Sequence, residues 1–133
     1  MPYKVDFDPI HRVLRCRLIG RITDEELRHY YSLAEDHVAK TDPLGGILDM
    51  TAITSSEVSA TTIRELAKSP SAFPNRDHPR VLIAPSDPAF GLARMFEIEG
   101  QERRPNLHVV RSEREALAIL GIQKASFKPI AIS

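Results

Sequence analysis

The sequence is poor in cysteine, lacks tryptophan and contains no long apolar run. Its one cysteine, Cys16, cannot form an intrachain disulfide or a CxxC site for zinc or redox chemistry. The 18 Lys and Arg residues balance the 18 Asp and Glu residues, so the chain has no general attraction for nucleic acid or anionic lipid. No segment has the roughly 20 apolar residues of a membrane span, and residues 1–6 contain acid where a signal peptide is apolar. These absences argue against nucleic-acid binding, membrane insertion and secretion, and they predict a cytoplasmic protein.

Motifs of cofactor and nucleophile chemistry are also missing. The six glycines never fall in the GxGxxG or GxxxxGK spacing that cradles phosphates, and there is no GxSxG nucleophile elbow. Glu26 and His29 have the spacing of half a di-iron site, but without a second copy we interpret them as a solvated helix face. Cys16 alternates with charged neighbours and is interpreted as a small buried residue.

The basic residues at 103–104 and 111–114 are interleaved with glutamates, which indicates solvated surface. We therefore expect no metal, no cofactor and no catalytic residue.

The order of the expected elements predicts an α/β domain over residues 1–122. Apolar and polar residues alternate over residues 2–8 and 12–19, which predicts two strands in an N-terminal antiparallel hairpin. Two nearly continuous apolar runs, at 46–50 and 80–84, predict central strands that are covered on both faces. One more strand is expected at 107–111, and four helices, each opened by a Ser or Thr cap, are expected at 23–40, 59–68, 86–99 and 112–120. The resulting β-β-α-β-α-β-α-β-α order predicts a single mixed β-sheet with three crossover connections and with helices packed on it.

The C-terminal tail, residues 123–133, contains Phe127, Ile130 and Ile132. Apolar side chains in a tail are expected either to dock on the domain or to mediate association. If the tail mediates association, we expect a symmetric homodimer in which it adds to a sheet edge or covers a helix face.

Hydroxyl side chains gather in one segment, where they make up seven of the twelve residues from 51 to 62. The segment follows a predicted central strand and opens a predicted helix, so we expect a loop at the edge of the sheet where α/β proteins bind ligands and partners. The candidates for partner binding or modification are Thr51, Thr54, Ser55, Ser56, Glu57 and Ser59. The alternative is that these hydroxyls only cap helices and satisfy turns.

The residues around this segment resemble the STAS domain, and most closely its bacterial SpoIIAA-like group. Residues 48–53, Leu-Asp-Met-Thr-Ala-Ile, match the end of the family's signature strand, and residues 57–60, Glu-Val-Ser-Ala, fall on its acid-Ser-Ser-Gly positions. Further similarity lies at 80–87 and 90–96. The resemblance implies a SpoIIAA-like fold. In the antagonist proteins of this family the first serine of the signature is phosphorylated, and Val58 stands at that position here, so the usual phospho-switch is not expected.

Three functions remain open at this point. The first is a non-enzymatic interaction or regulatory domain that presents residues 51–62 to a protein partner. The second is a module for a small apolar molecule or a lipid, because the resemblance extends to the Sec14 lipid-binding type. Its expected pocket wall is Phe73, Phe90, Met95 and Phe96, which can equally be ordinary core residues. The third is an enzyme that combines the hydroxyl cluster with Asp49 and Glu57.

Overall fold

The N-terminal hairpin forms as the alternating pattern predicts. In the computed structural model, which describes residues 3–130, β1 (Tyr3–Asp8) pairs antiparallel with β2 (Val13–Thr23). Val5 lies opposite Cys16 in this pairing, and both side chains are buried. The parts of the first predicted strand and of the tail that fall on residues 1–2 and 131–133 lie outside the described residues.

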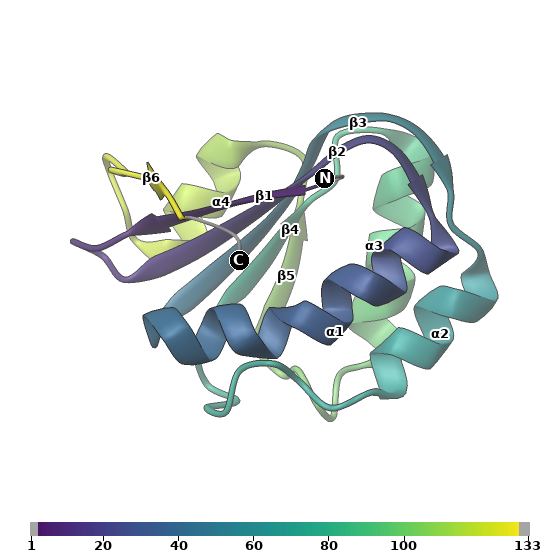
Figure 1. The fold of residues 1–133 in the computed structure, drawn as a ribbon, viewed down its shortest axis with the longest axis horizontal. Helices are drawn as coiled ribbons and strands as arrows, with labels where there is room; N and C mark the ends of the chain where they lie inside the picture. Colours follow the sequence, from purple (N-terminus) through teal and green to yellow (C-terminus); the bar gives the residue numbers. More distant parts are fainter. Residues whose placement is uncertain (1–2, 131–133) are drawn as a thin grey trace.

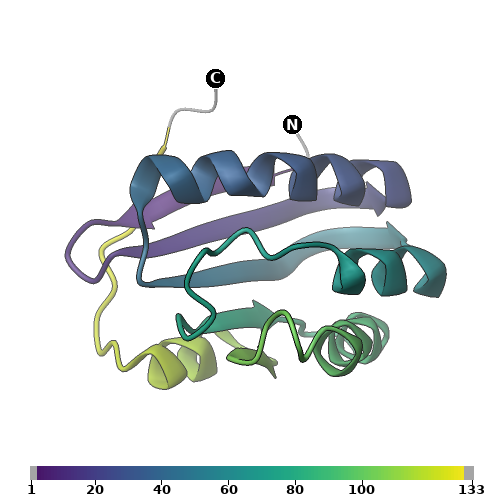
Figure 2. The same cartoon turned by 90° about the horizontal axis from the view of Figure 1, so that it is seen from below.

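Three crossover connections carry the chain from β2 across the sheet, each through one helix. The strands that follow are β3 (Gly45–Glu57), β4 (Arg80–Ile83) and β5 (Leu107–Val110), and the connecting helices are α1 (Asp24–Thr41), α2 (Ala60–Lys68) and α3 (Asp87–Glu99). All three strands run parallel to β2. Right-handed crossovers that advance in one direction place their helices on the same face. Accordingly α1, which lies in front of the strands in Figure 2, shares one core with α2 and α3, and α4 (Glu113–Leu120) packs in a separate core on the other side of the sheet.

The C-terminal tail adds a strand to the edge of its own sheet. Within residues 3–130 the sheet has six strands in the order β5-β4-β3-β2-β1-β6, where β6 (Lys128–Pro129) pairs antiparallel with β1 (Figure 1). The backbone N–H of Ile130 donates to the carbonyl of Val5 at 2.9 Å, and that of Ser126 donates to the Asp8 carboxylate at 2.9 Å. These bonds cover the edge of β1, so the tail docks on its own domain, which is one of the two outcomes expected for it.

The predicted helix caps form as expected. Thr23 and Glu26 make a reciprocal capping box at the start of α1. The hydroxyls of Ser59, Ser86 and Ser112 each accept the backbone N–H three residues further on. Gly121 ends α4 with a φ of +71°, a conformation that favours glycine.

The sheet separates two hydrophobic cores. The larger core lies between the sheet and helices α1 to α3 and includes Cys16, whose thiol pKa is raised to about 11 by burial. The smaller core lies under α4 and includes Ile47, Val81 and Ala116. The side chains of β3 and β4 therefore enter both cores, which explains why these strands read as continuous apolar runs.

The predicted loop at residues 51–57 is wrong, because this segment continues β3 as a strand. Residues 52–57 pair in parallel with residues 19–23 of β2, and we call this two-stranded extension the β2–β3 arch. The register shifts on either side of Gly20, whose φ is +79°. Such irregularities bend a strand. Figure 1 shows the arch curving over the top of the sheet toward the starts of α1 and α2.

Candidate functional site

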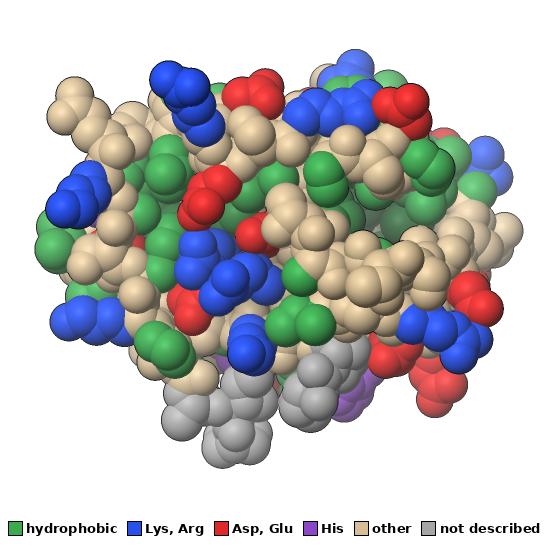
Figure 3. All heavy atoms as spheres, turned by 90° about the horizontal axis from the view of Figure 1, so that it is seen from above, with side chains coloured by type: hydrophobic (Ala, Val, Ile, Leu, Met, Phe, Trp, Pro, Cys, Tyr) green, Lys and Arg blue, Asp and Glu red, His purple; other side chains and the backbone are tan. Residues whose placement is uncertain are grey.

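The β2–β3 arch covers a cavity of about 500 Å³, which we call the arch cavity. Its walls come from the larger core, and they include Leu18, Leu48, Ile53, Ile63, Leu92 and Phe96. Pro85 and Ser86, which follow β4, also line the cavity. The cavity therefore lies beyond the carboxyl end of a parallel strand, the usual place for a binding site in an open α/β sheet. Figure 3 shows hydrophobic side chains around a hollow on the right of the face that it draws.

The rim of the arch cavity contains half of the candidate residues from the hydroxyl-rich segment. Thr54, Ser55 and Ser56 line the cavity and are exposed. Val58, at the position of the family's phosphorylated serine, also lines the cavity and packs partly buried against the larger core. Apolar walls with a few polar groups at the mouth are typical of small-molecule sites, which have volumes of about 300–1,000 Å³.

Ser59 has a structural role at the start of α2. Its hydroxyl accepts the N–H of Thr62 at 3.2 Å and donates to the Asp24 carboxylate at 2.9 Å. Its backbone N–H donates to the other oxygen of Asp24 at 2.7 Å. Hydrogen bonds from Ser59 lower the pKa of Asp24, so these contacts join the start of α1 to the start of α2 through a charged acceptor. Ser59 fits the alternative reading of this segment, in which its hydroxyls serve as helix caps.

The two carboxylates considered for an enzyme do not converge. Asp49 is buried in β3, where it accepts the N–H of the exposed Thr51 at 2.8 Å. Glu57 ends the same strand and forms an ion pair with Arg21. The two acids are eight residues apart in the strand, a length along the chain of roughly 26 Å. Within residues 3–130, moreover, no three His, Cys, Asp or Glu side chains are grouped so that they could hold a metal ion.

A smaller cavity of about 80 Å³ lies next to the arch cavity, and we call it the arginine cavity. Arg80, the first residue of β4, and Arg104, which precedes β5, both line it and are 7% and 4% exposed. Arg104 contradicts the prediction of a solvated surface at residues 103–104. Its Nη1 donates to the carbonyl of Ala67 at 3.1 Å, so Arg104 is buried because it caps the end of α2.

Arg80 is buried without such a set of hydrogen-bond acceptors. Its Nη1 donates to the hydroxyl of Ser71, but its Nε and Nη2 are buried without a hydrogen-bond partner among residues 3–130. Burial and the neighbouring charge of Arg104 lower the pKa of Arg80 to about 10, so the group still carries a full charge at neutral pH. Burial raises the pKa of Tyr31, a third residue of this cavity, to about 12, so Tyr31 is a neutral hydrogen-bond donor.

The aromatic residues proposed for a pocket divide into two groups. Phe96 lines both cavities, and Phe73 lines the arginine cavity, where the Arg80 guanidinium lies over its ring at 5.1 Å. Phe90 and Met95 line neither of the two cavities and pack partly buried against the larger core. Phe90 also stacks under the guanidinium of Arg111, with 4.0 Å between the guanidinium carbon and the ring centre.

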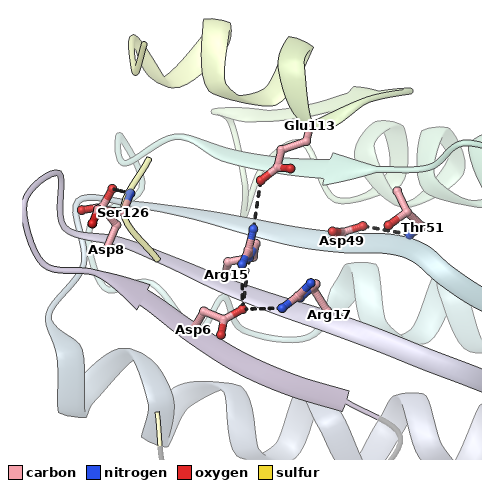
Figure 4. Close-up of polar contacts among 8 residues, drawn as sticks. All are labelled: Asp6, Asp8, Arg15, Arg17, Asp49, Thr51, Glu113 and Ser126. Atoms are coloured by element: carbon pink, nitrogen blue, oxygen red, sulfur yellow. Dashed lines mark hydrogen bonds and ion pairs between the residues drawn. The ribbon is translucent and has the colours of Figure 1, made fainter. Parts of the chain in front are cut away.

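The opposite face of the sheet carries a different polar group of residues (Figure 4). The carboxylate of Asp6 accepts hydrogen bonds from Arg15 at 2.9 Å and from Arg17 at 3.2 Å. Arg15 also donates to Glu113 of α4 at 2.9 Å, and its guanidinium lies over the ring of Phe127 in the tail. The buried charges on this face therefore have partners, and together they join β1, β2, α4 and the tail.

The chain folds as an α/β protein built on one mixed sheet. An uncharacterized protein from the DUF3478 family of Shewanella loihica PV-4, whose crystal structure has a SpoIIAA-like fold, matches this chain with a TM-score of 0.51. The two sequences are 18% identical, and the match covers 81% of this chain and 83% of that chain. No family model and no curated protein matches the chain. The chain therefore has a SpoIIAA-like fold, which confirms the fold that the STAS-like motifs predicted.

Three features of the site were not predicted from the sequence. These are the arch, the burial of Arg104 and the isolated charge of Arg80. The available signal for Arg80 was a charged residue at the start of an apolar run that was predicted to be covered on both faces. Arg104 gave no such signal, because the acidic and basic residues beside it are typical of a solvated surface.

Proposed function

We propose that this protein is a non-enzymatic binding module that takes a small apolar molecule into the arch cavity. The observation that supports this proposal is the volume of about 500 Å³ between the β2–β3 arch, α2 and α3, with mostly apolar walls. A well-packed core of this size contains few voids larger than a water molecule. A cavity of this volume is typical of proteins that bind small molecules.

The proposal is tested by filling the cavity from one of its walls. Ala89 is half-buried on α3 and lines the arch cavity, so the Ala89→Phe variant should weaken or abolish binding of the neutral apolar dye Nile red, measured by its fluorescence. The matched control is Ala118→Phe, the same substitution at an exposed position on α4, across the sheet from the arch cavity. This control should bind the dye like the wild type.

Two outcomes contradict the proposal. Wild-type protein that does not bind Nile red has no accessible apolar site. If the Ala89→Phe variant is folded, as judged by circular dichroism, and binds the dye with unchanged affinity, then the dye binds outside the arch cavity. Native mass spectrometry of protein purified from its own cells adds an independent measurement, because a retained small molecule is visible as added mass.

A second candidate function is the interaction or regulatory domain that the STAS resemblance predicts. The observation in its favour is the row of exposed hydroxyls at Thr54, Ser55 and Ser56. Ser56 accepts the N–H of Val58 at 3.4 Å, whereas no described residue forms a hydrogen bond with the Ser55 hydroxyl. Ser55 is therefore the better candidate for modification, in place of the serine that Val58 replaces.

The regulatory candidate is tested by mapping phosphate on the same purified protein. Phosphorylation on residues 54–56 supports it, and a chain that is unmodified under all growth conditions contradicts it. The predicted protein partner and the predicted homodimer stay predictions, and size-exclusion chromatography with light scattering measures the second directly.

A further inference from the structure

Arg80 presents an unusual combination of charge, burial and missing partners. The residue is 7% exposed, and two of its guanidinium nitrogens, Nε and Nη2, have no hydrogen-bond partner among residues 3–130. No carboxylate of the described residues forms an ion pair with it. A buried charge without a partner is strongly unfavourable. An anion that reaches these two nitrogens would therefore stabilise the native protein.

The residues around Arg80 also favour the binding of a negative charge. Arg104 lines the same cavity, and its charge lowers the pKa of Arg80. Arg104 donates to backbone carbonyls at the end of α2, so its hydrogen bonds are satisfied while its charge has no carboxylate partner among residues 3–130. Tyr31 lines the same cavity, and its ring packs 5.8 Å from that of Phe96, over which the Arg104 guanidinium lies at 4.7 Å. The arginine cavity thus combines two cations with one neutral donor.

The arginine cavity adjoins the arch cavity. Tyr31, Leu48, Leu82 and Phe96 line both of them. The smaller cavity, at about 80 Å³, has room for a headgroup of a few atoms, whereas the larger one, at about 500 Å³, has room for a hydrocarbon chain. One molecule that spans both cavities needs a small anionic end and an apolar body.

We propose that the ligand is an amphiphilic carboxylic acid, with its carboxylate on Arg80 and its hydrocarbon part in the arch cavity. This inference rests on the proposed function. Nε and Nη2 lie on one side of the guanidinium, and that edge matches the two oxygens of a carboxylate in a bidentate pair. Tyr31 supplies a further donor, and Arg104 stabilises the carboxylate charge from the side.

The test compares two probes of equal chain length that differ in their headgroup. Dodecanoate and 1-dodecanol are titrated below their aggregation limits at pH 8, where the acid is ionised, and their affinities are measured by displacement of Nile red. Wild-type protein is expected to bind dodecanoate at least about tenfold more tightly, because the carboxylate forms a bidentate ion pair with the guanidinium and the single neutral hydroxyl oxygen does not.

The variant that isolates the headgroup site is Arg80→Met, which keeps a straight apolar side chain at the start of β4. It is expected to lose the preference for dodecanoate, so that the ratio of the two affinities falls to about one. The control is Arg103→Met, which removes the same charge at an exposed position next to Arg104 and should retain the preference. Circular dichroism and thermal unfolding of each variant confirm that it is folded.

The outcomes separate this inference from the function on which it rests. If neither probe binds the wild type, both proposals fail. If the two probes bind equally, or if Arg80→Met keeps the preference for dodecanoate, then the headgroup site is wrong and the apolar binding function stands. If inorganic phosphate binds in an Arg80-dependent way and 1-dodecanol does not bind, the site takes a free anion and the amphiphile is wrong.

Discussion

The arginines on the two faces of the sheet differ in how their charge is neutralised. On the face that packs against α4, Arg15 and Arg17 share the carboxylate of Asp6, and Arg15 also reaches Glu113. On the face that packs against α1 to α3, Arg80 and Arg104 line a cavity and form no ion pair with a described residue. Arg17 also leaves its Nε without a partner, but Asp6 neutralises its charge.

This difference separates a structural role from a binding role. Paired charges join elements that are distant in the sequence, as Arg15 joins β2 to β1 and α4. Unpaired buried charges stabilise nothing by themselves, because removal from water is unfavourable for each of them. An arginine that is retained in such a place is therefore a candidate for ligand recognition. Opposite effects on stability are expected when the two groups are mutated.

The largest effect is expected from the Asp6→Asn substitution on the paired face. It leaves the guanidinium groups of Arg15 and Arg17, which are 12% and 37% exposed, without their shared carboxylate, which should lower the free energy of unfolding by about 2–3 kcal/mol. Urea denaturation measures this change. The control is Glu113→Gln, where the carboxylate is half exposed and the expected loss is below about 1 kcal/mol. Equal losses in the two variants would contradict a special role for Asp6.

The next effect concerns pH and the tail strand. Burial by itself would raise the pKa of Asp8, but hydrogen bonds from Ser126, His11 and Ile10 lower it to about 2. Because this pKa lies below the unfolded value of 3.8, the carboxylate stabilises the fold above about pH 4. The contribution, about 2 kcal/mol, is lost as the pH falls from about 4 to 2.

Urea denaturation at a series of pH values measures this contribution of Asp8. The Asp8→Asn variant should lose the part of the acid dependence that belongs to this group, and it should loosen the pairing of β6 with β1. A wild-type stability that changes between pH 4 and 2 exactly as that of the variant does would show that Asp8 has an ordinary pKa in the folded protein.

The unpaired face should respond in the opposite direction. The Arg80→Met substitution removes a buried charge that has no carboxylate partner among residues 3–130, so the ligand-free protein should keep its stability or gain up to about 2 kcal/mol. Chemical denaturation of delipidated protein gives the value. A loss of several kcal/mol would mean that Arg80 has a structural role, as Arg15 does, and would weaken the comparison between the two faces.

The sequence was sufficient for the elements whose signals are local. The side chain that caps a helix and the N–H that it accepts are three residues apart, so Thr23 and Ser59 marked the starts of α1 and α2 correctly. The apolar runs of β3 and β4 indicated their burial in the same way. The tail could be assigned only as apolar, because its pairing with β1 depends on a partner more than 100 residues away.

The candidate site could not be predicted from local sequence patterns, because it is formed by contacts between residues that are distant in the sequence. Residues 52–57 were predicted as a loop because of their hydroxyls, yet parallel pairing with residues 19–23 makes them a strand. β-Branched residues such as Ile53 and Thr54 are compatible with either structure, and the pairing decides between them. The burial of Arg104 likewise depends on the end of α2, which is 37 residues earlier in the chain.

The smallest effect separates two serines of the hydroxyl-rich segment. Ser59→Ala removes the cap of α2 and a bond to Asp24, so it should lower the free energy of unfolding by about 1 kcal/mol. Ser55→Ala changes an exposed rim residue and should stay within about 0.5 kcal/mol of the wild type. Urea denaturation of both variants measures the difference, and equal values would contradict the assigned roles.

If the difference holds, a phosphate on Ser59 would disrupt the start of α2, whereas a phosphate on Ser55 would leave that cap intact. Regulation of the arch by modification is therefore compatible with the fold at Ser55 and not at Ser59.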